Sequence, residues 1–193
     1  MNDIAVSKPL GRNKIHPKKF ALWVACASIL MMFASLTSAY IVRRAGGNWL
    51  EFQLPAVFYF NTLTIVLSSI TLQGAYRAFK KQNFSLYKIL LVVTLILGLL
   101  FVGLQYQGWT TLAAEGVPLR TNPSGDFVYV LSAIHAVHVL GGIAVLIVAG
   151  LHAYTLPEKV TPARKLRFEL TLTYWHFVDF LWLYLLVFLI QLA

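Results

Sequence analysis

The sequence predicts an all-α integral membrane protein, a helical bundle with five transmembrane helices. Of its 193 residues, 59% are hydrophobic and 12% are charged, and the charged fraction is about half that of an ordinary soluble domain. Five apolar segments, separated by short polar stretches, are each long enough to cross a hydrocarbon layer of about 30 Å. Because backbone polar groups in lipid must be satisfied within each segment, and no segment alternates like a barrel strand, all five are predicted to be helices.

The first predicted helix covers residues 20–42 and follows a basic tail at residues 1–19, which is assigned to the cytoplasm below. Residues 20–193 are assigned to one five-helix domain. A cleaved signal peptide is the competing interpretation of the first segment, since its end resembles a cleavage site. The apolar stretch is, however, too long for a signal core.

The second predicted helix, residues 56–76, starts behind Pro55, and the third covers residues 87–109. Proline is common at the boundaries of helices. The second segment is rich in hydroxyl and amide side chains, which we expect to hydrogen-bond to other helices at about 0.6 kcal/mol each. These residues are Asn61, Thr62, Ser68, Ser69 and Thr71.

The fourth predicted helix covers residues 127–154 and the fifth covers residues 170–192. A stretch rich in Gly, Pro and Asn at residues 116–125 precedes the fourth helix, and Pro157 and Pro162 separate it from the fifth. These residues favour turns and helix ends.

The basic residues predict the orientation of the bundle. A formal charge of +9 would suit a nucleic-acid-binding protein, but the basic residues lie in loops beside apolar segments, so no nucleic-acid partner is predicted. Thirteen Lys and Arg residues fall in the tail and in the second and fourth loops, against three in the other two loops and the C-terminal end. The positive-inside rule therefore predicts that the N-terminus is inside and the C-terminus outside.

Ionisable residues inside the last two segments are the candidates for function. His176 and Asp179 are three residues apart, which places them on one helical face about 5–6 Å apart at Cβ. His135 and His138 repeat this spacing, and Trp175 lies beside His176. Such groups are costly in lipid, so we assign all five to a polar intramembrane network.

This network has two open interpretations: a proton relay, or a set of groups that fixes helix packing. If the last two helices are neighbours, an imidazole of the fourth helix is expected to hydrogen-bond to Asp179. Imidazole is also a common ligand of metals and haem. The chain offers few further ligands at matching depth, so no metal site and no catalytic residue are predicted.

A charged group stands before the fifth segment. Arg164, Lys165, Arg167 and Glu169 are assigned to a lipid headgroup site, because the three basic side chains suit lipid phosphates. Glu169 is expected in the first turn of the fifth helix, where a carboxylate suits the helix dipole. The alternative is a solvated interfacial loop without a specific ligand.

Two motifs resemble a known family. The run YWHFVD (residues 174–179) resembles the last helix of subunit III of the haem-copper terminal oxidases, the cytochrome c oxidase subunit III family. HAVHVLGG (residues 135–142), one segment earlier, occurs in the family's order and at its approximate spacing. Gln105 and the polar residues of the second helix are also similar to the family. The chain resembles its short, five-helix form.

The resemblance implies an accessory subunit of a proton-pumping oxidase in aerobic respiratory electron transport, located in the bacterial inner membrane and without activity of its own. Haem and copper would lie in partner subunits I and II, while this chain would hold none. It would pack on subunit I, bind structural phospholipids, and support proton uptake and sustained turnover. Membership in a larger respiratory supercomplex is also possible within this family.

One departure from the family concerns the first helix. Many members carry a glutamate there, whereas residues 20–42 contain no carboxylate and Ser28 lies at or near that place. A role that depends on this acid is therefore in doubt. The electron donor is open as well, because quinol oxidases have similar five-helix third subunits, although Tyr174 before Trp175-His176 resembles the cytochrome c branch.

Two other classes compete with this interpretation. A small proton channel or transporter would use the same His and Asp residues, but the spans show neither paired broken helices nor an inverted repeat. A b-type cytochrome subunit would bind haem through His135 or His138. An optical spectrum separates them, since only the cytochrome has a Soret band.

The predicted orientation can be tested by cysteine labelling in a Cys26→Ser background. We expect Arg120→Cys to react with an impermeant thiol reagent from the periplasmic side, and Lys81→Cys to react only after the cytoplasmic side is exposed. The reverse pattern would reject the orientation.

Overall fold

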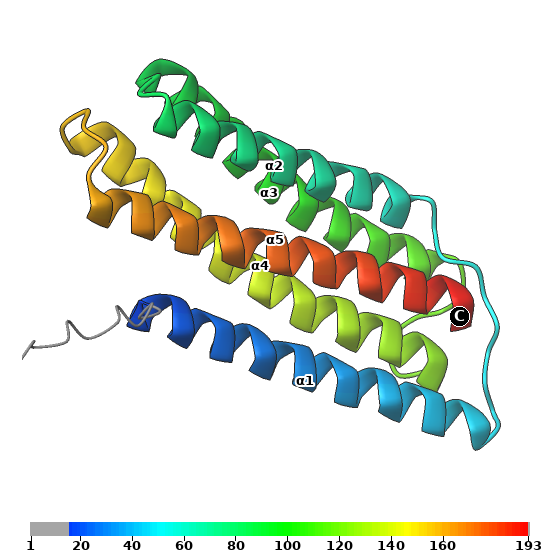
Figure 1. Ribbon diagram of the computed structural model, residues 1–193. Coiled ribbons are helices and arrows are strands. Elements are labelled where there is room, and N and C mark those ends of the chain that lie inside the picture. Colours follow the sequence, from blue (N-terminus) through cyan, green and yellow to red (C-terminus); the bar gives the residue numbers. More distant parts are fainter. Residues whose placement is uncertain (1–15, 193) are drawn as a thin grey trace, which may run out of the picture.

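The structure, a computed structural model, describes residues 16 to 192 as an antiparallel bundle of five long helices (Figure 1). All five are long and apolar enough to cross a membrane, which confirms the predicted helical membrane bundle. Most of the predicted basic tail lies outside the described residues, and residues 17–19 belong to the first helix. The helices are α1 (Pro17–Ala45), α2 (Val57–Lys80), α3 (Phe84–Ala114), α4 (Pro123–Thr155) and α5 (Pro162–Leu192).

The helices extend beyond most ends of the predicted apolar segments, and the largest extension at one end is in α5, which begins at Pro162 and not at residue 170. With 24 to 33 residues, they are about 36–50 Å long, longer than the hydrocarbon core of about 30 Å. Their polar ends stay helical in the headgroup region. The expectation for Glu169 is therefore wrong: this residue lies two turns inside α5, away from the terminal N–H groups that a first-turn carboxylate would face.

Asparagine side chains cap the N-termini of α3 and α4. Asn83 Oδ1 accepts the Leu86 N–H of α3 at 3.1 Å, and Asn122 Oδ1 accepts the Ser124 N–H of α4 at 2.9 Å, with Pro123 as the first helical residue. Each asparagine satisfies a backbone donor that the first turn of a helix leaves free. The two caps fix where α3 and α4 begin.

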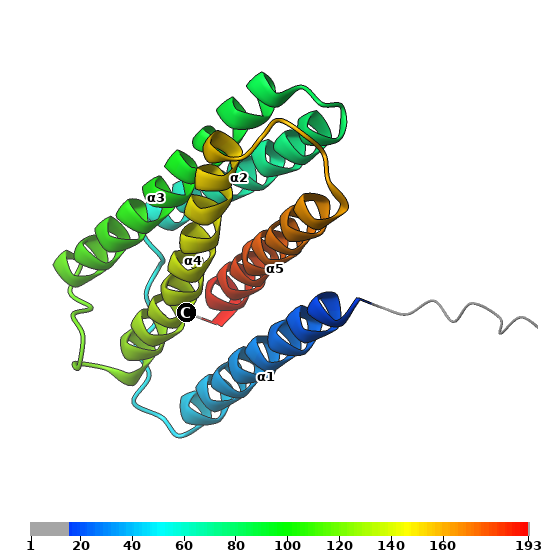
Figure 2. The ribbon, with the colours of Figure 1, turned by 90° about the vertical axis from the view of Figure 1, so that its left-hand side faces the viewer.

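The helices form a bundle in which α4 and α5 occupy the middle (Figures 1 and 2). The α2–α3 hairpin packs on one side of this pair, and α1 packs on the other. α1 contacts α4 and α5, but within the described residues it contacts neither α2 nor α3. The two helices that carry the sequence motifs are therefore the ones that hold the bundle together.

Trp175 of α5 joins four helices at the centre of the bundle. Its side chain is 1% exposed, and its indole nitrogen donates to Ser68 Oγ of α2 at 3.0 Å. A Cβ atom at Gly98 of α3 would lie 2.9 Å from the indole ring, and one at Gly142 of α4 would lie 3.0 Å from it. The ring fits because both neighbouring helices present glycine at this level.

We expect Gly98→Ala to destabilise the chain by about 1–3 kcal/mol, since the added methyl group overlaps the Trp175 ring. Gly103→Ala, on the same helix with no atom within 4 Å of the new Cβ, is the matched control and should be neutral or mildly stabilising. Thermal unfolding in detergent measures both. Equal effects of the two substitutions would contradict the packing described for Trp175.

Candidate functional site

The polar side chains predicted to link α2 to other helices all do so, which confirms that expectation. Two of the bonds reach α3 and three reach α5. Toward α3, Asn61 Nδ2 donates to Gln105 Oε1 at 2.8 Å, and the Thr71 and Thr94 hydroxyl groups are bonded at 2.8 Å. From α5, the Trp182 indole donates to Thr62 Oγ1 at 2.9 Å, the Trp175 indole donates to Ser68 Oγ, and His176 is bonded to Ser69. The interface of α2 with α5 is thus the most polar part of the intramembrane bundle.

His176 lies half-buried in this interface, bonded through both ring nitrogens. Nδ1 contacts Ser69 Oγ, and Nε2 lies 3.3 Å from Gln73 Oε1. Ser69 and Gln73 are one helical turn apart on α2, so His176 joins α5 to two successive turns of α2.

Asp179, one turn further along α5, is 5% exposed. Neither of its carboxyl oxygens has a hydrogen-bond partner among residues 16–192. Ser69, which contacts His176, also lies close to Asp179. The expected bond from an α4 imidazole to Asp179 is not formed, so this part of the prediction is wrong.

His135 is packed among aromatic rings. Its ring is fully buried and lies 5.7 Å from Phe101 and 5.0 Å from Trp182 between ring centroids, with Phe33 of α1 at 6.4 Å. Both ring nitrogens are without a partner in the described chain.

His138 faces a different direction. Its Nδ1 lies 2.7 Å from the Ile134 carbonyl oxygen one turn earlier in α4, and its ring packs edge-on to Phe33 at 5.9 Å. The Tyr174 hydroxyl donates to the His138 carbonyl at 3.1 Å. His138 therefore helps to seat α1 and α5 on α4 through packing and backbone contacts.

The five predicted network residues thus form separate groups: Trp175 bonds to Ser68, His176 contacts Ser69 and Gln73, Asp179 has no partner in the described chain, and His135 and His138 pack among aromatic rings. Gln73 was missed by the sequence analysis. It lies four residues after Ser69 on α2, a helical spacing that could have indicated a shared partner.

Glu169 connects three helices at the predicted cytoplasmic end of the bundle. Its carboxylate forms an ion pair with Lys19 of α1 at 2.7 Å and accepts the Tyr76 hydroxyl of α2 at 2.8 Å. Lys165, one turn earlier in α5, is a weaker partner at 4.0 Å. The side chain therefore ties α1 and α2 to α5.

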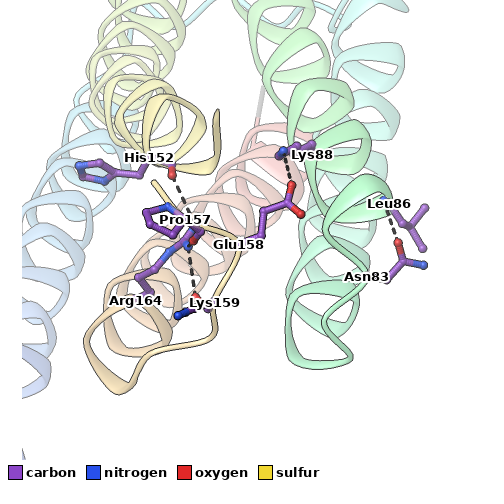
Figure 3. A network of polar contacts seen from close by, with 8 residues as sticks. All are labelled: Asn83, Leu86, Lys88, His152, Pro157, Glu158, Lys159 and Arg164. Carbon is purple, nitrogen blue, oxygen red and sulfur yellow. Dashed lines mark hydrogen bonds and ion pairs between the residues drawn. The ribbon is translucent and has the colours of Figure 1, made fainter. Parts of the chain in front are cut away.

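Arg164 closes the turn between α4 and α5 (Figure 3). Its guanidinium donates to the carbonyl oxygens of Pro157, Lys159 at 3.2 Å and His152 at 3.4 Å. Figure 3 also shows Lys88 of α3 paired with Glu158 of the same turn at 2.7 Å. The hydrogen-bonding groups of Arg164 are thus largely used within the protein.

A cavity of about 480 Å³ opens beside this turn. Its walls are mostly apolar side chains of α4 and α5, including Val145, Val148 and Phe168, and Leu22 of α1 contributes to them. Arg164 and Arg167 lie at its edge. The Arg167 side chain is exposed and makes no hydrogen bond or ion pair within the described residues. The cavity is thus mostly apolar, and one of its lining arginines has no partner in the described chain.

Within residues 16–192, no three His, Cys, Asp or Glu side chains gather closely enough to hold a metal ion. His135 and His138 lack further ligands around them.

Comparison with known proteins decides the family. The model of the family "Cytochrome c oxidase subunit III" matches residues 19–192. The probable cytochrome c oxidase subunit 3 of Nocardia farcinica is 33% identical over 173 residues, which cover 84% of this chain and 80% of the relative. The chain belongs to the cytochrome c oxidase subunit III family. The resemblance inferred from the two motifs is confirmed.

Other members of the subunit III family show how widely the match extends. Cytochrome c oxidase subunit 3 of Bacillus sp. (strain PS3) is 28% identical over 189 residues, covering 91% of this chain and 84% of the relative. A probable quinol oxidase subunit 3 of Staphylococcus saprophyticus is 27% identical over 173 residues, covering 86% and 85%. Membership makes the chain a multi-pass bacterial membrane protein of a haem-copper oxidase complex, an oxidoreductase.

Proposed function

We propose that this chain is the accessory, metal-free subunit III of a proton-pumping haem-copper oxidase, packed on catalytic subunit I next to subunit II. The family match over residues 19–192 carries the proposal. Cytochrome c is the favoured electron donor, because relatives named for cytochrome c oxidase have the higher identity. A quinol donor is the second candidate, favoured by the Staphylococcus relative.

The α2–α5 interface supports a role in assembly and proton uptake. His176 is held between Ser69 and Gln73, and the Asp179 carboxyl group lies behind them without a partner. A buried carboxyl group in lipid is expensive to keep. We infer that Asp179 contributes to the complex through its carboxyl group, at a distance from the oxygen-reducing site.

The cavity beside the α4–α5 turn supports phospholipid binding. Its apolar walls suit acyl chains, and basic side chains near the membrane surface attract anionic headgroups. Of the four residues predicted to bind headgroups, Glu169 is paired with Lys19, and Arg164 is bonded to carbonyl oxygens. The proposal therefore rests on Arg167, with Lys165 as a neighbour.

Deletion of this chain tests the accessory role. We expect the oxidase purified without it to keep its full haem and copper content, because the chain is assigned no metal. A tagged version of the chain should in turn co-purify the catalytic subunit in mild detergent. Loss of one haem or copper per complex, or absence of any oxidase subunit from the purified material, would end the proposal.

Asp179→Asn tests the carboxyl group. Asparagine keeps the shape but cannot carry the charge or proton of the acid, so we expect poorer assembly or faster loss of activity during turnover, with the initial rate of oxygen consumption preserved. Asp126→Asn, which still offers an oxygen to the Arg120 N–H, is the matched control. Normal assembly and unchanged inactivation would contradict the assignment, and an immediate fall to near zero would favour direct proton delivery.

Arg167→Ala tests the headgroup site. Removal of this cation should lower retention of an anionic phospholipid by roughly fivefold, since a basic residue near the surface contributes about 1 kcal/mol. Native mass spectrometry of the purified complex counts the bound lipids. Arg77→Ala, which removes the same charge outside the cavity, should leave retention unchanged; equal losses from both would indicate only general electrostatic attraction.

A further inference from the structure

Ser69 differs from the other serine and threonine residues of α2. The others donate their hydroxyl hydrogens to carbonyl oxygens of their own helix at 2.7–2.9 Å; they are Thr62, Thr64, Ser68 and Thr71. Such bonds to the preceding turn are common for hydroxyl side chains inside helices. Ser69 forms no such bond, and its hydrogen-bond partner within residues 16–192 is the His176 ring. The Ser69 hydroxyl group is therefore not held by the backbone of α2.

The Asp179 carboxyl group lies close to this hydroxyl group. Asp179 is 5% exposed, and neither carboxyl oxygen has a partner in the described part of the chain. Trp175 and Trp182 lie about one turn before and one turn after it on the same face of α5, but their indole N–H groups are donated to hydroxyl oxygens of α2. Of these three neighbouring donors, only the Ser69 hydroxyl hydrogen can turn toward the carboxyl group, because a hydroxyl group rotates to suit its partner.

His176 stands on the other side of Ser69 and is suited to exchange a proton with it. Its Nε2 atom lies 3.3 Å from Gln73 Oε1. An amide oxygen accepts hydrogen bonds, so the ring form that donates from Nε2 to Gln73 leaves Nδ1 open toward Ser69. Imidazole is a common proton shuttle. His176 is also half-buried, whereas Asp179 is almost fully buried, so the imidazole is the more accessible end of this row of three side chains.

We propose that Asp179, Ser69 and His176 form a proton relay, in which the serine hydroxyl group passes a proton between the buried carboxyl group and the imidazole. In one direction the carboxyl O–H bond breaks as Ser69 Oγ takes the proton, and Ser69 gives its own hydrogen to His176 Nδ1. The products are a carboxylate and an imidazolium, so the net charge within the membrane is unchanged. The reverse transfer returns the proton to Asp179. This inference rests on the proposed role in proton uptake and names the side chains that carry the proton.

Infrared difference spectroscopy of the purified complex tests the relay. After a step into acidic D2O, the growth of the deuterated carboxyl band of Asp179 measures how fast hydrogen isotopes reach this group, whether it starts as an acid or as a carboxylate. The band is identified by its loss in Asp179→Asn. We expect Ser69→Ala to slow its growth by roughly a hundredfold, the lower end of what a positioned acid–base group contributes. Ser69→Thr keeps the hydroxyl group and should keep most of the rate.

Two further variants complete the test. His176→Asn can still form hydrogen bonds but cannot carry a proton, so it should slow the exchange as Ser69→Ala does; if Ser69→Ala does not assemble, His176→Asn and Ser69→Thr decide. Ser35→Ala is the matched control and should leave the rate unchanged, because the Ser35 hydroxyl donates to the Met31 carbonyl of its own helix at 2.9 Å.

Equal exchange rates with and without the Ser69 hydroxyl group would overturn the relay. It would also be overturned if Asp179→Asn removed no exchanging band, or if Ser35→Ala slowed the exchange as much as Ser69→Ala. Each of these results leaves the proposed function standing, because that function is judged by co-purification and metal content. Failure of the unsubstituted chain to recover any oxidase subunit would instead contradict the proposed function.

Discussion

The bundle depends on one steric constraint, the fit of the Trp175 indole between two glycines. Gly98 and Gly142 leave no room for a methyl group beside the ring, and Ser68 fixes the ring's orientation through its hydrogen bond. Four helices are thereby set at one depth by a single side chain. Gly142, which ends the HAVHVLGG motif of α4, thus makes room for this indole.

The position of Trp175 determines what its neighbours can do. Successive helical residues are about 100° apart, so a tryptophan aimed at α3 and α4 turns His176 toward the flank of α2. There His176 lies between Ser69 and Gln73, which contact its two ring nitrogens. Asp179, one turn further along α5, lies close to the same serine but has no hydrogen-bond partner among residues 16–192.

Sequence patterns predicted the structural features that depend on the polarity of residues in lipid, and missed those that depend on side-chain geometry. Five spans and the bonding residues of α2 follow from hydropathy and from the cost of lone polar groups. The start of α5 at Pro162 does not follow from hydropathy, because a helix can extend beyond its apolar residues into polar sequence. The bond expected between an α4 imidazole and Asp179 is not formed, since His135 packs among aromatic rings and His138 Nδ1 contacts a carbonyl oxygen of its own helix. Spacing along a helix cannot reveal these orientations.

His135 and Asp179 are both buried polar groups without partners in the described bundle, and each such group costs about 1–3 kcal/mol relative to a bonded one. An apolar residue of similar size would make the isolated bundle more stable at either place. His135 is fully buried among aromatic rings, so no partner outside the bundle can supply its missing bonds. The packing of these rings, and of Trp175 between its two glycines, must therefore offset the cost.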